Sequence, residues 1–150
     1  MFAVLVVGLL LTLAVAIIGW FRPVAPKLPA APTYSAQQVA DAKKKVCSTF
    51  TKVDNAVRAA SARNKGDDYA TQFATAINVR QALVVGSQYL STTLNQEPAT
   101  STELASSVRD LVNSYQLLTI ELLSDAPELE KDPTVHAGDE ANSKIENQCK

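Results

Sequence analysis

The sequence is poor in the residues that most often build reactive sites. Its 150 residues include one histidine, two cysteines and five glycines, which leaves little material for a histidine-based active site, a zinc cluster or a glycine-rich phosphate loop. The 14 lysines and arginines nearly balance the 15 aspartates and glutamates, so the formal net charge is −1. Proteins that bind nucleic acid normally carry a clear basic excess. The composition therefore gives no support to a nucleic-acid partner.

Charge is absent from the first part of the chain, where an apolar run extends from Phe2 to Phe21. As a helix this run would span roughly 30 Å, the thickness of the hydrocarbon core of a bilayer. Trp20 lies where aromatic rings favour the headgroup region, and Arg22 follows the run. A cleavable signal peptide is the alternative, but its apolar region usually has about 7–15 residues after a basic leader. The pattern predicts an uncleaved transmembrane anchor over residues 1–21.

Gly8, Thr12 and Ala16 recur at a spacing of four residues within this run. The spacing places them on one face of a helix, where small side chains allow a second membrane helix to approach closely. Small residues are also common in membrane helices generally. The stripe indicates either packing against a helix of another membrane protein or an ordinary anchor composition.

Prolines recur at a strict period of three after the anchor, at Pro23, Pro26, Pro29 and Pro32. Polyproline II has three residues per turn, so these rings would form one ridge. At about 3.1 Å per residue the segment makes a spacer of roughly 30 Å. We expect residues 22–34 to form a stiff stalk that carries a soluble domain over residues 35–150. A docking site for a proline-reading module is the alternative.

Helical spacing begins at Ser35, which forms a capping-box pattern with Gln38. The apolar stripe of this first helix consists of Val46, Phe50, Val53, Val57 and Ala60. Polar residues 64–68 end it, and Asp68 has the character of a turn residue and an N-terminal helix charge. A second helix is predicted from about Tyr69 to Leu94. Its apolar side contains Phe73, Ile77, Leu83, Val84, Leu90 and Leu94.

The third predicted helix has the clearest pattern in the chain. Thr100 and Glu103 repeat the capping-box spacing. The stripe that follows consists of Leu104, Val108, Leu111, Tyr115, Leu118 and Leu122. Pro127 and Pro133 then interrupt, so only a short, polar helix is expected from near Val135 to Cys149. No segment alternates with period two, and the domain is predicted to be all-α, an antiparallel bundle of three main helices plus a short fourth.

The two cysteines, Cys47 and Cys149, lie in the first and last of these predicted helices. Two free thiols are the alternative in a cytosolic protein, whereas an exported domain would oxidise them. A bridge that closes a loop of about 100 residues stabilises a fold by roughly 4–5 kcal/mol in the chain-entropy treatment. We therefore predict a disulfide that pins the polar C-terminal helix to the bundle.

Two signals conflict over the side of the membrane on which the domain lies. Arg22 and Lys27 follow the anchor, and the positive-inside rule alone would place the domain in the cytoplasm. The predicted disulfide favours an extracytoplasmic domain. Because the charge bias is small, we give more weight to the cysteines. We predict a single-pass protein of the cell membrane with its C-terminal domain outside the cytoplasm.

Charge is distributed unevenly along the chain. Residues 1–80 contain ten lysines and arginines and four acidic residues, whereas residues 81–150 contain four and eleven. Lys43–Lys45 lie near Cys47, and Glu140 and Glu146 lie near Cys149. A disulfide would therefore bring opposite charges together. Attraction of the lysines to anionic lipid is an alternative, but the stalk would hold them beyond a Debye length of about 8 Å. An ordinary solvated face is the simpler interpretation.

Few other residues suggest chemistry. His136 lies near Asp132, Asp139 and Glu140, but one histidine with carboxylates is a weak signal for a metal site, and a solvated loop or helix start is the simpler interpretation. Arg80 either contacts a ligand or partner, or lies at a helix edge with its stem packed and its head in water. No serine is paired with a base, as a hydroxyl nucleophile requires. We predict no catalytic, cofactor-binding or metal-binding residue.

A loose motif lies in the second predicted helix, Asn78-x-Arg80-x-Ala82-Leu83-x-x-Gly86-x-x-Tyr89-Leu90, with Cys47 upstream and Cys149-Lys150 at the end. With these features the chain resembles a group of actinobacterial, mycobacterial-type, single-pass envelope proteins that are rich in alanine and proline. The resemblance implies an anchor, a proline-rich stalk and an exported helical domain. It carries over no catalytic residue.

These features favour a non-catalytic, membrane-anchored accessory or scaffold subunit of a membrane protein complex in the cell envelope, such as a respiratory or transport assembly. Its expected partners are the lipid bilayer and other integral membrane or envelope proteins, without a cofactor. The alternative is an extracytoplasmic module that binds a lipid or another apolar envelope ligand between its helices, which requires a cavity. An enzyme is the third hypothesis and would need residues beyond those identified.

Overall fold

The computed structural model describes residues 6–8, 12–13, 32–63 and 66–150. The chain divides into two units, Met1–Thr33 and Tyr34–Lys150. Residues 6–8 and 12–13 of the first unit are helical, and they include Gly8 and Thr12. Ala16, most of the predicted anchor and residues 22–31 of the predicted stalk lie outside the described residues. No helix within the described ranges is long and apolar enough to cross a membrane.

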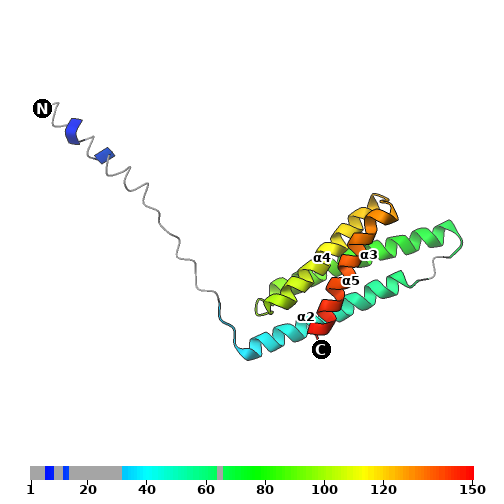
Figure 1. The fold of residues 1–150 in the computed structure, drawn as a ribbon, viewed down its shortest axis with the longest axis horizontal. Helices are drawn as coiled ribbons and strands as arrows, with labels where there is room; N and C mark the ends of the chain where they lie inside the picture. Colours follow the sequence, from blue (N-terminus) through cyan, green and yellow to red (C-terminus); the bar gives the residue numbers. More distant parts are fainter. Residues whose placement is uncertain (1–5, 9–11, 14–31, 64–65) are drawn as a thin grey trace. The chain divides into compact units, whose positions relative to one another are not determined.

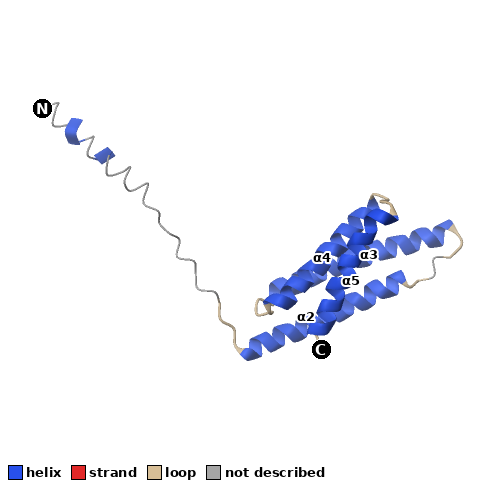
Figure 2. Ribbon diagram, in the orientation of Figure 1, coloured by secondary structure: helices blue, strands red, loops and turns tan. Residues whose placement is uncertain are grey.

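The second unit contains four α-helices (Figure 1). They are α2 (Ala36–Ser61), α3 (Tyr69–Gln96), α4 (Thr102–Leu123) and α5 (Glu128–Gln148). Each packs on the next in antiparallel order, and α5 packs chiefly on α4. No strand occurs in the part of the chain that is described (Figure 2). The all-α prediction is therefore confirmed.

The predicted starts of the first three helices are right to within a residue. Ser35 Oγ accepts from the Gln38 N–H at 3.2 Å, and Gln38 Oε1 accepts from the Ser35 N–H at 2.8 Å, which completes the capping box. Asp68 caps α3, and hydrogen bonds from the side chain and backbone of Thr71 lower its pKa. The prediction for the third helix was wrong by one position. Ser101 is the N-cap of α4.

The core is formed by apolar side chains of all four helices. Its members are Val46, Phe50, Val53, Leu83, Leu90, Leu94, Leu104, Ala105, Val108, Leu111, Val112, Tyr115, Ala141 and Ile145. The predicted stripes of α2 and α4 are largely confirmed. The prediction for α3 was wrong in two places, because Phe73 is 50% exposed and Val84 is 37% exposed. Arg80 of α3 contacts Leu122 near the end of α4. Because the two helices are antiparallel, the part of α3 well before Arg80 extends beyond the end of α4.

The fourth helix is longer than predicted. It starts at Glu128 and continues through Pro133, which was expected to delay its start to about Val135. Proline removes one hydrogen bond to the carbonyl four residues earlier, which here belongs to the exposed Leu129. Its buried residues, Thr134, Gly138, Ala141 and Ile145, recur at helical spacing. This stripe is hard to recognise in the sequence because half of it is not strongly apolar.

Gly86 allows α2 and α3 to approach closely. A methyl group added at its Cα would lie 2.7 Å from Cγ1 of Val53, which is buried and stiff about its first side-chain torsion. We expect Gly86→Ala to lower the free energy of unfolding by about 1 kcal/mol, because the overpacking penalty of about 1–3 kcal/mol outweighs a gain of about 1 kcal/mol in helix propensity.

The control is the same substitution in a Val53→Ala chain, where the colliding methyl group is gone. There Gly86→Ala should be neutral or raise stability by up to about 1 kcal/mol. Urea unfolding of the four chains gives the comparison. An equal loss in both backgrounds would show that the contact with Val53 is not the cause.

Candidate functional site

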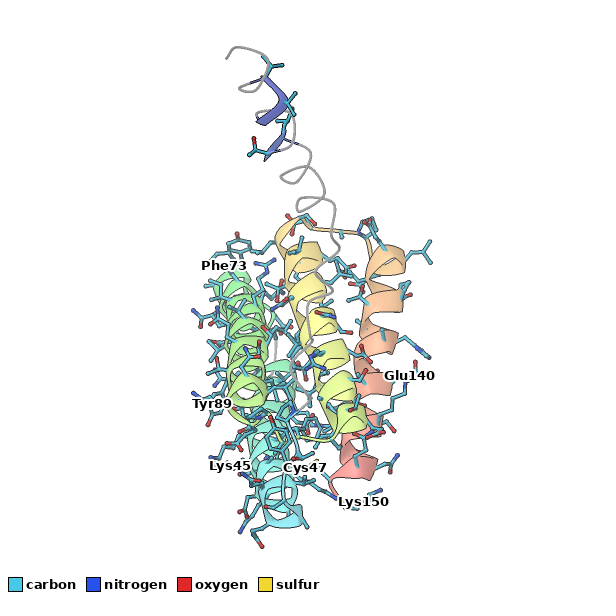
Figure 3. The ribbon with its side chains drawn as sticks, turned by 90° about the vertical axis from the view of Figure 1, so that its left-hand side faces the viewer. Lys45, Cys47, Phe73, Tyr89, Glu140 and Lys150 are labelled. Atoms are coloured by element: carbon cyan, nitrogen blue, oxygen red, sulfur yellow. A yellow bond between two sulfur atoms is a disulfide. The ribbon has the colours of Figure 1, made fainter. Side chains whose placement is uncertain are left out.

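The predicted disulfide between Cys47 and Cys149 is present. Their Cα atoms are 5.6 Å apart and the residues are separated by 102 positions. The bridge lies at the same end of the bundle as Lys45 and Lys150 (Figure 3). It ties the C-cap of α5 to the first half of α2, and neither cysteine is left as a free thiol.

The expected meeting of opposite charges is right only in part. Arg58 Nη2 lies 3.2 Å from Glu146 Oε1, which joins α2 to α5. Lys45 Nζ instead lies 2.7 Å from Oε1 of Glu97, the C-cap residue of α3, and this contact raises the lysine pKa. Glu140 pairs within its own helix with Lys144 at 3.0 Å. These ion pairs depend on which residues are neighbours in the fold. Closeness to a cysteine in the sequence did not predict them.

A cavity of about 260 Å³ opens between the helices, and all four helices contribute to it. Its apolar lining includes Val57, Val79, Leu83, Leu118 and Val135. Its polar lining includes Asp54, Arg58, Tyr115, Asp139 and Asn142. We call this feature the α2–α5 cleft, because helices α2 and α5 supply its polar rim apart from Tyr115. The cleft is the most site-like feature of the bundle because apolar and hydrogen-bonding groups converge in it.

A second hollow, of about 380 Å³, adjoins the cleft. Ser61 and Val79 line both, so the two hollows share a boundary. The second hollow lies mainly along the first half of α3 and reaches Leu122 of α4. The space between helices therefore continues from the α2–α5 cleft toward the start of α3.

Polar contacts fix the rim of the α2–α5 cleft. Arg58 Nε donates to both carboxylate oxygens of Asp54, at 2.9 and 2.7 Å. Asn142 Nδ2 donates to Asp54 Oδ1 at 3.2 Å, whereas Asn142 Oδ1 is buried and accepts no hydrogen bond from the described residues. A buried acceptor without a partner is unusual in a folded protein. This atom is therefore a position at which an added donor would be favourable.

Tyr115 has a buried side chain and lines the same cleft, and its hydroxyl group interacts electrostatically with Asp54, Arg58 and Asp139. Burial raises its pKa to about 12, with a further increase from the carboxylate of Asp54. Arg58 opposes this rise, and Asp139 adds to it. The phenol therefore stays protonated at neutral pH and can donate or accept a hydrogen bond. The sequence pattern identified Tyr115 only as a core residue, because its polar neighbours come from α2 and α5.

Arg80 has a structural role within the bundle that neither sequence interpretation named. Its Nη2 donates to the carbonyl oxygen of Leu122 at 2.5 Å, and Asp125 lies 3.9 Å away. Helix α4 has no basic residue in its own last turn, so Arg80 supplies a positive charge where the helix dipole favours one. Its Nε is buried and has no hydrogen-bond partner in the described part of the chain. The guanidinium group of Arg80 therefore contacts protein groups, whereas the helix-edge interpretation of the sequence placed it in water.

His136 and Glu121 are two further polar positions of the bundle. His136 lies on the exposed side of α5, and no group of three potential metal ligands occurs within the described ranges. Glu121, which sequence reasoning missed, is a buried carboxylate in α4. Its Oε1 accepts from Thr134 at 2.7 Å, and its Oε2 has no partner among the described residues. The position of Glu121 beside Leu122, a member of the apolar stripe of α4, was the signal in the sequence that could have indicated its burial.

Large apolar side chains are exposed where α3 begins and α4 ends. We call this set the apolar end; its members are Tyr69, Phe73, Ile120, Leu123 and Leu129. The rings of Tyr69 and Phe73 stack with centroids 5.9 Å apart. Because α3 and α4 are antiparallel, these residues belong to the same end of the bundle, opposite the disulfide (Figure 3).

Comparison of the chain with known protein families, with curated proteins and with solved structures finds no significant match. The likeness to actinobacterial envelope proteins therefore stays a prediction.

Proposed function

We propose that this chain is a non-catalytic accessory subunit, tethered to the cell membrane, whose helical domain binds an integral membrane protein of the cell envelope. The observation that carries the proposal is the apolar end. Single exposed apolar residues are ordinary on protein surfaces. Here Tyr69 and Phe73 contact one another, and further large apolar side chains are exposed at the same end of the bundle, which favours an interaction site. The stacked pair of Tyr69 and Phe73 adds rigid aromatic area, which is typical of residues that dominate binding energy.

Three features support the proposed location. The disulfide is of a kind that persists in oxidising compartments. The uncharged run from Phe2 to Phe21 has the length of a membrane span. The period-three prolines between it and the bundle favour an extended spacer. Together they favour an extracytoplasmic bundle held near, but not in, the lipid, where it would meet other envelope proteins.

The test is to purify the full chain from its native membranes in mild detergent. We expect a stoichiometric protein partner, and a photo-crosslinking residue placed at position 73 should attach to it. Replacing both Tyr69 and Phe73 by serine should remove the partner. The control is Val85→Ser, because Val85 is also exposed on α3 but lies outside the apolar end.

Unchanged melting temperatures of the variants would show that partner loss does not reflect unfolding. A full chain that purifies alone and gives no crosslink from position 73 would refute the accessory role. Equal loss of the partner in Val85→Ser and in the double variant would refute the assignment to the apolar end.

A second candidate function is a binding module for a small amphiphilic molecule. The observation that favours it is the α2–α5 cleft, in which an apolar lining meets a polar rim. Sequence reasoning named this function as its alternative and required a cavity for it.

A further inference from the structure

The shape of the α2–α5 cleft limits what could fill it. Its volume of about 260 Å³ lies just below the usual range of about 300–1,000 Å³ for small-molecule sites. Val57, Val79 and Leu83 provide an apolar lining, which favours the body of an aliphatic molecule. Space for a longer body continues past Ser61 into the adjoining hollow.

The charges at the rim decide the kind of head group. Asp54 and Asp139 both line the cleft, whereas Arg58 is its one lining cation among the described residues. The guanidinium of Arg58 is already engaged with Asp54 at 2.7 Å and with Glu146 at 3.2 Å. An incoming anion would therefore meet an excess of carboxylates, whereas a cation would be attracted.

The hydrogen-bonding groups of the cleft also favour a cationic head group. Asn142 Oδ1 is buried and lacks a donor, and the orientation of the amide is fixed because its Nδ2 donates to Asp54. The Tyr115 hydroxyl oxygen can also accept. An ammonium group has three donors and no acceptor, so it matches a site rich in acceptors, and a carboxylate does not.

We propose that the α2–α5 cleft binds a small amphiphile with an aliphatic body and a cationic amine head. The body lies against Val57, Val79 and Leu83, and the ammonium group lies at the rim between Asp139, Asn142 and Tyr115. This proposal rests on the second candidate function and names the ligand class for it.

The experiment compares three probes that share one aliphatic body and differ in head charge: octylamine, 1-octanol and octanoate. The full chain is placed in lipid nanodiscs with its methyl groups isotopically labelled, and shifts of the Val57 and Val79 methyl signals are followed during titration. Empty nanodiscs correct for partition of each probe into lipid. We expect saturable shifts with octylamine and about fivefold weaker binding of octanol, as for the loss of one favourable charge contact. Octanoate should bind more weakly still.

Matched variants locate the site. Ser61→Trp should block the boundary of both hollows and abolish the shifts, whereas Ala59→Trp adds the same bulk to an exposed α2 position that does not line the cleft. Asp139→Asn should weaken octylamine binding about fivefold. Glu140→Gln should not, because Glu140 pairs with Lys144 and lies outside the lining.

Two results would overturn the proposal. Octanoate binding as tightly as octylamine would exclude a cationic head, and shifts that are absent or that persist in Ser61→Trp would exclude the cleft. The partner purification is repeated with Ser61→Trp to separate the two functions. If Ser61→Trp keeps its protein partner but loses amine binding, the ligand site is independent of the partner site. If the unmodified chain keeps its partner but binds no amine, only the ligand proposal is refuted.

Discussion

Replacing both Cys47 and Cys149 by serine is expected to lower the free energy of unfolding by about 4 kcal/mol. The bridge closes a loop with a sequence separation of 102 residues, and chain-entropy treatments assign about 4.7 kcal/mol to a loop of that size, of which real proteins often realise somewhat less. Global stabilities are about 5–15 kcal/mol. The double variant should therefore be only marginally stable.

The bridge also has a local role in this fold. Helix α5 packs chiefly on α4, and among the described residues its covalent and polar links to α2 are the disulfide, the Asn142–Asp54 hydrogen bond and the Arg58–Glu146 ion pair. Exposed ion pairs contribute about 0–1 kcal/mol. Without the covalent link, these two polar contacts are weak restraints, and the rim of the α2–α5 cleft should loosen as well.

Guanidinium unfolding of the full chain, with and without a reducing agent, measures this effect. Reduced unmodified chain and the double serine variant should unfold at the same denaturant concentration, well below that of the oxidised chain. The reducing agent should leave the double variant unchanged, which serves as the control. Coincident midpoints for oxidised and double-variant chains would show that the bridge does not stabilise the bundle.

The sequence predicted those parts of the fold that depend on neighbours in the chain. The capping box at Ser35 and the stripe of α4 depend on residues three and four positions apart, so spacing alone reveals them. The disulfide was predicted because an exported domain would oxidise its cysteines, and the two cysteines of the chain allow a single pairing. By contrast, the exposure of Phe73 depends on where α4 ends in space, which no local pattern encodes.

The candidate site could not be assembled from the sequence for a similar reason. The α2–α5 cleft joins Asp54, Tyr115 and Asn142 from three helices, and each of these residues looks ordinary in its own helix. Whether four amphipathic helices close or leave a hollow depends on the angles between them and on small residues such as Gly86. The contact between Arg80 and Leu122 likewise depends on tertiary packing.

Helix α5 is the element whose length was most underestimated, and its packing leads to the second large prediction. The helix has few apolar residues, and Ile145 is its one large aliphatic side chain that is fully buried, at 0% exposure. Ile145→Ala is expected to lower the free energy of unfolding by about 2–5 kcal/mol, because it removes buried area and leaves a cavity. This loss should appear even with the disulfide intact.

The matched control is Ile120→Ala, the same chemical change at a helical position that is 62% exposed. Its effect on stability should stay within about 0.5 kcal/mol. Hydrogen exchange then tests where the loss acts, because amides of α5 should exchange faster in Ile145→Ala while those in the middle of α4 stay protected. Equal, small effects of the two substitutions would mean that the disulfide rather than apolar packing holds α5 on the bundle. Uniformly faster exchange across all four helices would mean that α5 does not open independently and that the bundle unfolds as one unit.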